Sequence, residues 1–100
     1  MITLKEETAE LIRLEMESIP EKYQKPFNST HEGLAVLREE YIELENEIFF
    51  GEKQYLQMAK ESGFTEYDCR DVARINHLIS VKQEAIQVAA MAARIIQELT

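Results

Sequence analysis

The chain has 100 residues and a formal net charge of −8 at pH 7, with 45% hydrophobic and 30% charged residues. This length allows one small domain, residues 1–100, and this composition excludes a disordered chain. With only 3 Gly and 2 Pro, an all-β chain with many turns is excluded as well. The single cysteine, Cys69, excludes an intrachain disulfide scaffold and is typical of a reducing, cytoplasmic setting.

The acidic charge and the hydropathy pattern also restrict the partners. The excess of carboxylates should repel a nucleic-acid backbone and an anionic membrane surface. The longest apolar run, residues 88–93, is too short to span a membrane, and the acidic N-terminal segment does not resemble a signal peptide. We therefore expect a cytoplasmic protein that binds neither nucleic acid nor membrane. A phosphate-bearing small molecule remains compatible with this charge if cations screen the carboxylates.

The N-terminal segment predicts a first helix over about residues 3–18. Thr3 and Glu6 have the spacing of a capping box, and apolar residues follow at helical intervals. Pro20 should end this helix, because proline restricts the residue before it. Residues 20–30, which contain both prolines, are the expected linker.

A second helix is predicted to begin at Ser29, which forms a capping box with Glu32. Its apolar residues alternate steps of three and four and predict one buried seam: Leu34, Leu37, Tyr41, Leu44 and Ile48. Gly51 either ends this helix or weakens it. Residues 52–61 can resume as a short helix, and Gly63 interrupts the pattern again.

A third helix is predicted from a cap at Thr65 to about residue 98. It carries two apolar stripes: Leu78, Val81, Ala85, Val88, Ala92, Ile95 and Leu99 form one, and Val72, Ile75, Ile79, Ile86, Ala89, Ala93 and Ile96 form the other. A single chain of this length cannot cover so long an apolar rod. The predicted fold is therefore all-α, with three or four helices in a helical bundle that is a homodimer or homotetramer.

Carboxylates at helical spacing give the only pattern that indicates chemistry. Glu40 and Glu43 lie three residues apart and share one helix face. Glu84 and Gln87 repeat this spacing inside the most apolar part of the chain, where a carboxylate needs a partner. Such oxygen ligands suit Mg²⁺ or Mn²⁺, which retain waters for substrate phosphates. The same spacing is also common on solvated helices.

These residues resemble motifs of the MazG-like all-α nucleotide pyrophosphohydrolases. Residues 39–43, Glu-Glu-Tyr-Ile-Glu, match the Glu-Glu-x-x-Glu motif of that family, and Glu84-Ala85-Ile86-Gln87 is similar to its later Glu-x-x-Asp motif. His31 and the Gln-Val-Ala-Ala segment at residues 87–90 are similar to a compact branch found in phages and prophages. The resemblance covers about residues 20–50 and 80–98.

The resemblance implies an Mg²⁺-dependent enzyme that hydrolyses a nucleoside triphosphate to the monophosphate and pyrophosphate. It implies metal ligation by Glu40, Glu43, Glu84 and Gln87, with Mn²⁺ as a possible substitute. It also assigns catalytic roles to Glu39 and Glu40, with Glu39 helping to orient the attacking water. The ions would neutralise phosphate charge during the reaction.

Other readings of the same residues predict no catalysis. Gln87 occupies the position of the family's Asp, the interval between the two motifs is long, and the family's downstream Lys/Asn segment has no counterpart before Thr100. These differences favour a helical scaffold or interaction protein that has lost the activity. An acidic mimic of DNA is a third reading, based on net charge alone. Glu47 and His77 are expected on solvated surfaces.

Overall fold

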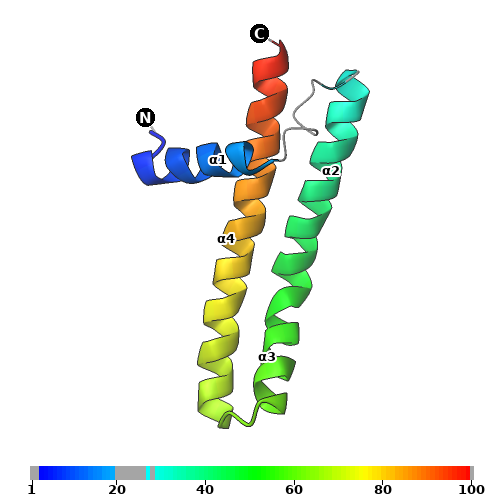
Figure 1. Cartoon of the computed structure of the whole chain (residues 1–100). Helices are drawn as coiled ribbons and strands as arrows, with labels where there is room; N and C mark the ends of the chain where they lie inside the picture. Colours follow the sequence, from blue (N-terminus) through cyan, green and yellow to red (C-terminus); the bar gives the residue numbers. More distant parts are fainter. Residues whose placement is uncertain (1–2, 20–26, 28, 100) are drawn as a thin grey trace. The chain divides into compact units, whose positions relative to one another are not determined.

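The computed structural model describes residues 3–19, 27 and 29–99. Its elements, in chain order, are α1 (Glu6–Ser18), α2 (Thr30–Asn46), the π-helical turn η2 (Glu47–Gly51), α3 (Glu52–Glu61) and α4 (Glu66–Leu99) (Figure 1). The prediction of an all-α chain is confirmed, since no strand occurs in these ranges. None of the described helices is long and apolar enough to cross a membrane.

Contacts within the chain define two compact units, residues 1–40 with 86–100 and residues 41–85. The prediction of one domain over residues 1–100 is not tested by this division and stays a prediction.

In the first unit, the guanidinium of Arg94 lies 4.2 Å from the centre of the Phe27 ring. Glu98 accepts hydrogen bonds at 3.1 Å from the Phe27 amide and from Arg94 Nε. Gly33 is buried, and a Cβ atom there would lie 3.2 Å from Phe27.

Helix α1 begins later than the sequence predicts. Lys5, in an extended conformation, is the cap residue and makes no capping bond with its side chain. The predicted capping box at Thr3 is therefore wrong. The helix ends at Ser18, close to the predicted position, and Ile19 is extended (φ −66°, ψ 124°), as expected for a residue before proline. The rest of the predicted linker lies largely outside the described residues.

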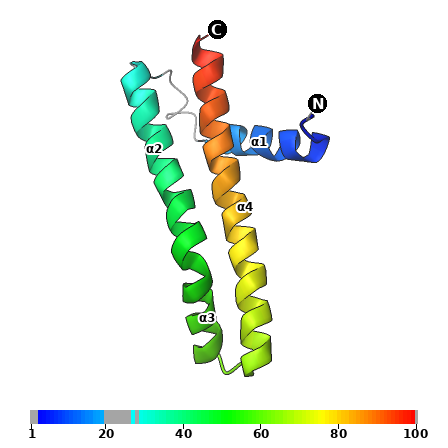
Figure 2. The same ribbon diagram turned by 180° about the vertical axis from the view of Figure 1, so that it is seen from behind.

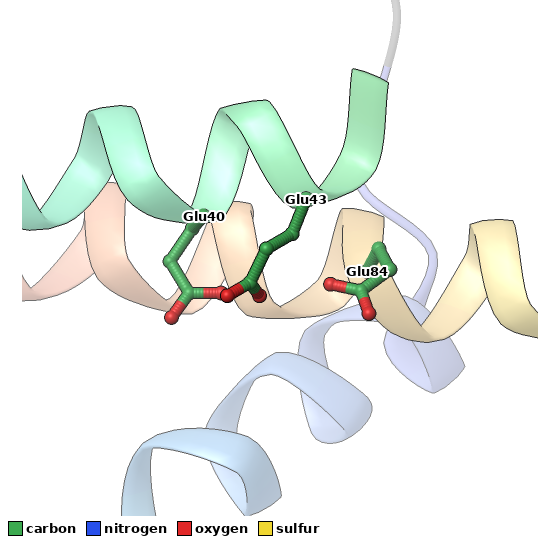
Figure 3. A group of neighbouring side chains, drawn as sticks. All are labelled: Glu40, Glu43 and Glu84. Carbon is green, nitrogen blue, oxygen red and sulfur yellow. The ribbon is translucent and has the colours of Figure 1, made fainter. Parts of the chain in front are cut away.

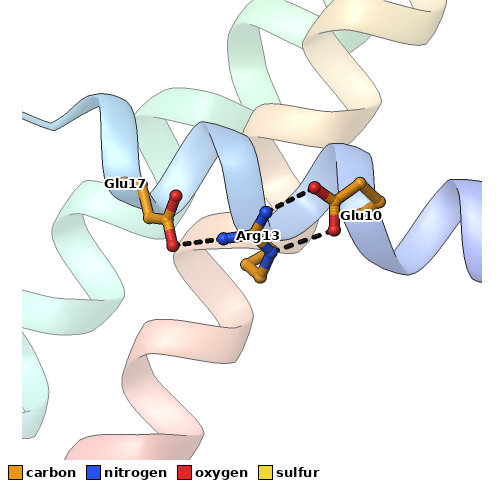
Figure 4. A network of polar contacts seen from close by, with 3 residues as sticks. All are labelled: Glu10, Arg13 and Glu17. Atoms are coloured by element: carbon orange, nitrogen blue, oxygen red, sulfur yellow. Dashed lines mark hydrogen bonds and ion pairs between the residues drawn. The ribbon is translucent and has the colours of Figure 1, made fainter.

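An exposed ion-pair network follows one side of α1. Arg13 Nε donates to Glu10 at 2.9 Å, and its two terminal nitrogens pair with Glu10 and Glu17 (Figure 4). The hydrogen bonds from Arg13 lower the pKa of the Glu10 carboxyl. All three side chains are solvated, so this network contributes little to stability.

The capping predictions for the later helices are confirmed. The amide of Glu32 donates to Ser29 Oγ at 3.2 Å, and the amide of Asp68 donates to Thr65 Oγ1 at 3.2 Å. Each hydroxyl satisfies an amide that has no partner within its own helix. These two caps fix the starts of α2 and α4.

Gly51 does not end the second helix. Its backbone is helical (φ −63°, ψ −41°), and the chain passes through η2 into α3 without a break. Gly51 is buried beneath Glu47, and a Cβ atom there would overlap the Glu47 carboxylate. Because Gly51 has no side chain, the Glu47 carboxylate can lie close to its backbone.

Gly63 ends α3 in a Schellman motif. Its φ of 85° lies in the left-handed region, its amide donates to the Lys60 carbonyl at 3.1 Å, and the Phe64 amide donates to the Ala59 carbonyl at 3.3 Å. Residues 62–65 then reverse the chain, so that α3 and the first half of α4 lie side by side in both views (Figures 1 and 2). Residues 41–85 form this helical hairpin.

Replacing Gly63 by alanine should destabilise the protein by about 1 kcal/mol, because a Cβ atom disfavours the left-handed conformation. Gly63→Asn should lose less, since asparagine tolerates this conformation better. Urea unfolding followed by circular dichroism measures both changes. Equal losses for the two variants would contradict the conformational explanation.

Candidate functional site

Three carboxylates from two helices meet at one place. Glu40 and Glu43 lie one turn apart on α2, and Glu84 lies on α4. Each offers an oxygen atom within 4.8 Å of the oxygens of the other two, and the three side chains point toward one another (Figure 3). Glu40 and Glu84 are half-buried, whereas Glu43 is exposed. The three acidic residues predicted as metal ligands are therefore neighbours in space.

The electrostatics of this carboxylate group are unfavourable without a cation. Partial burial raises the pKa of Glu84, and the negative charges of Glu43 and Glu47 raise it further. A hydrogen bond with Glu43 acts in the same direction. Each effect disfavours the ionised form of Glu84. A proton or a bound cation would relieve this repulsion.

The donor set fits a hard divalent cation. Mg²⁺ prefers oxygen ligands, commonly takes one or two carboxylates, and fills its other positions with water or phosphate oxygens. Glu40, Glu43 and Glu84 supply such oxygens, and the exposure of Glu43 leaves the group accessible from solvent. Exposed acidic groups also occur in proteins without a bound ion.

The remaining predicted site residues lie beside this group. Gln87 follows Glu84 by one turn of α4 and is half-buried. Glu39 precedes Glu40 on α2 and is exposed, and it is not part of the three-carboxylate group. His31 is exposed in the first turn of α2. The roles assigned to Glu39 and Gln87 stay predictions.

The predictions for Glu47 and His77 are wrong, because these side chains face each other inside the hairpin. Only 19% of the Glu47 side chain and 13% of the His77 side chain are exposed, and His77 Nδ1 lies 3.5 Å from Glu47 Oε1. Both atoms are buried and have no hydrogen-bond partner among the described residues. The contact becomes an ion pair when His77 is protonated.

Sequence reasoning missed this pair because its members come from different helices. Glu47 follows Glu43 by four residues, so the spacing places both glutamates on neighbouring positions of one helix side, but it does not indicate that the Glu47 side chain is largely buried while Glu43 is exposed. His77 precedes Glu84 by seven residues, two helical turns, and shares its face in the same way. Glu47 and His77 thus extend, along their two helices, the rows of polar side chains that contain Glu43 and Glu84.

Comparisons with known proteins add no assignment. No family model, no curated protein and no solved structure matches this chain.

Proposed function

We propose that this protein is a divalent-cation-dependent nucleoside triphosphate pyrophosphohydrolase. Water would add across the α–β phosphoanhydride, so that the nucleoside monophosphate and pyrophosphate leave. The observation that supports this proposal is the meeting of Glu40, Glu43 and Glu84 within 4.8 Å. The resemblance of residues 39–43 and 84–90 to the pyrophosphohydrolase motifs gives the class of reaction.

The carboxylates of Glu40, Glu43 and Glu84 would hold Mg²⁺ or Mn²⁺, together with the amide oxygen of Gln87. When bound, the cation neutralises phosphate charge and activates water for attack. Glu40 would orient the triphosphate through the ion that it holds. Glu39, exposed beside Glu40, would accept a hydrogen bond from the attacking water and take up its proton.

The charge of the chain supports a small substrate. With 19 acidic and 11 basic residues, a nucleic-acid polymer would meet repulsion along its whole backbone. A single triphosphate needs only local neutralisation, which a divalent ion at the carboxylate group would provide. The proposal therefore concerns a free nucleotide.

A screen of nucleoside triphosphates with Mg²⁺ or Mn²⁺, with detection of pyrophosphate, tests this function. We expect pyrophosphate release with at least one nucleotide, and a loss of about 100-fold or more in Glu43→Gln, because a metal ligand should matter at least as much as the groups that support one. Glu52→Gln is the matched control, since it removes the same charge from an exposed position on α3. Folded wild-type protein that releases no pyrophosphate under any condition would favour the non-catalytic scaffold.

A further inference from the structure

The interior of the hairpin of residues 41–85 contains a pair of ionisable side chains that the proposed reaction does not use. Glu47 lies on η2 and His77 on α4, and only 19% and 13% of their side chains are exposed. Glu47 Oε1 and His77 Nδ1 are 3.5 Å apart, and both atoms are buried without a hydrogen-bond partner among the described residues. The fully buried described residues of the hairpin are small: Gly51, Ala59, Cys69 and Ala73.

Gly51 allows the Glu47 carboxylate to face His77. A Cβ atom at Gly51 would overlap Glu47 Oε1, the same oxygen that lies nearest His77 Nδ1. The Gly51 backbone is helical (φ −63°, ψ −41°), a conformation in which glycine is less stable than alanine. The close approach of the carboxylate is therefore the feature that requires glycine at this position.

The two facing atoms need a proton between them. A ring nitrogen without a proton and an ionised carboxylate are both hydrogen-bond acceptors, and two buried acceptors repel each other. With Glu47 ionised, His77 therefore carries a proton on Nδ1. The 13% of His77 that stays exposed lies elsewhere on its side chain, because Nδ1 itself is buried. The proton that His77 exchanges with solvent is then the one on Nε2.

Negative charge surrounds this pair. The charges of Glu43 and Glu47 both act on Glu84, which follows His77 by two turns of α4. Among the described residues, the ion pairs of the structure give Glu47 no partner other than His77. A positive charge on His77 would therefore compensate a largely buried carboxylate that has no other cation beside it.

The remaining ionisable groups of residues 43–55 and 71–84 do not take this role. The hydroxyl of Tyr55 on α3 forms a hydrogen bond with that of Ser80 on α4, and a tyrosine hydroxyl carries no charge near neutral pH. The other charged side chains of these two segments are exposed: Glu45, Glu52, Lys53, Asp71, Arg74 and Lys82.

We propose that the Glu47–His77 pair is a pH-sensitive switch that holds η2 against α4. Imidazole groups ordinarily gain their second proton between about pH 5 and 8. When both ring nitrogens of His77 are protonated, the Nδ1–H group donates to Glu47 and joins opposite charges, which strengthens the hydrogen bond. When Nε2 loses its proton as pH rises, the Nδ1–H bond stays but the compensating charge is lost. The contact between η2 and α4 then weakens, whether or not the protein hydrolyses nucleotides.

Urea unfolding at pH 5.5 and 8.5 in EDTA tests the switch, because EDTA removes divalent cations from the carboxylate group. His77→Gln should lower the equilibrium constant for folding about tenfold more at pH 5.5 than at pH 8.5, since a hydrogen bond between charged groups contributes more than one with a neutral donor. His31→Gln is the matched control, because it removes the other of the 2 histidines from an exposed position on α2. Its effect should be equal within about twofold at the two pH values, as for an exposed charge.

Gly51→Ala separates the contact from the ionisable groups themselves. The alanine Cβ would displace the flexible end of Glu47, while alanine itself favours a helix. In a Gly51→Ala background, the effect of His77→Gln should therefore lose its pH dependence. The proposal is wrong if His77→Gln has equal effects at both pH values in the native sequence, or if its pH dependence persists in the Gly51→Ala background.

Nitrogen NMR of the wild-type protein locates the proton directly and decides the proposal even if a variant fails to fold. At pH 8.5, His77 should carry a single ring proton, on Nδ1. The spectrum of His31→Gln identifies which signals belong to His77, because only 2 histidines are present. A single proton on Nε2 at this pH, or protons on both ring nitrogens, would overturn the proposal.

Discussion

Replacing Glu84 by glutamine is expected to stabilise the metal-free protein and to remove its stabilisation by Mg²⁺. Without metal, the substitution relieves repulsion with Glu43 and Glu47, which should add about 0.5–1 kcal/mol to the free energy of unfolding if each like-charge contact costs a few tenths. With metal, wild-type protein should gain about 2.7 kcal/mol at a hundred times the dissociation constant. The variant should lose most of this gain and about 100-fold or more of any hydrolytic activity.

The pH dependence of stability tests the predicted effect of Glu84 independently. The pKa of Glu84 is raised from its ordinary value of 4.5, so the folded state binds this proton more tightly than the unfolded state. The contribution of Glu84 to metal-free stability is therefore fully present below pH 4.5 and is lost as pH rises through the raised pKa. Glu84→Gln should flatten the stability profile over this interval.

Thermal unfolding from pH 4 to 8, with EDTA and with Mg²⁺, measures these effects. Glu52→Gln is the control, because it removes an exposed charge outside the carboxylate group. If Glu84→Gln were less stable without metal, or if Mg²⁺ raised the unfolding midpoint of both variants equally, the assignment of Glu84 as a metal ligand would be wrong.

Replacing Gln87 by aspartate should tighten Mg²⁺ binding and increase the hydrolysis rate by about tenfold, which corresponds to about 1.4 kcal/mol of the activation barrier. Gln87 follows Glu84 by one turn of α4, so an aspartate there would add a fourth carboxylate beside the proposed ion. In the scaffold alternative, the same substitution would bury a charge without a compensating cation and destabilise the protein by a few kcal/mol.

Calorimetric titration with Mg²⁺ and a pyrophosphate assay on the same samples separate these outcomes. Gln87→Asn controls for the shorter side chain without adding charge. A Gln87→Asp variant that is less stable in Mg²⁺ and inactive on every nucleotide would contradict the enzyme proposal. Unchanged stability and activity would show that Gln87 lies outside the metal site.

The local features of the fold were predictable because they depend on neighbouring residues. The caps at Ser29 and Thr65 each need only a hydroxyl and an amide three residues later. Thr3 has the same spacing, but α1 begins at Glu6 and its first turn makes no such bond. Spacing alone therefore permits a capping box without enforcing it.

The positions of the side chains in the tertiary structure were less predictable. The order of the helices and the isolation of Glu84 among apolar residues were enough to group it with Glu40 and Glu43. The burial of His77 depends on Glu47, thirty residues earlier on another helix, and no local pattern contains that contact. Periodicity groups Tyr41 and Leu78 in apolar seams, but the prediction that the seam of Tyr41 is buried is wrong for the single chain, in which Tyr41 is 55% and Leu78 56% exposed.

The π-helical turn η2 has a consequence for how the length of this chain can vary. From Glu47, inward residues follow at steps of four, at Gly51, Tyr55 and Ala59. In a regular α-helix three intervals of four residues would rotate the side chain by about 120° away from the interior. The wider π-helical turn compensates for this rotation. Deleting one residue within η2 would shorten the first interval from four residues to three. A regular α-helix could then keep the glutamates before η2 and Ala59 on the same side. Homologous chains one residue shorter at this point could therefore keep both ends of the hairpin aligned while losing the close approach of Glu47 to Gly51.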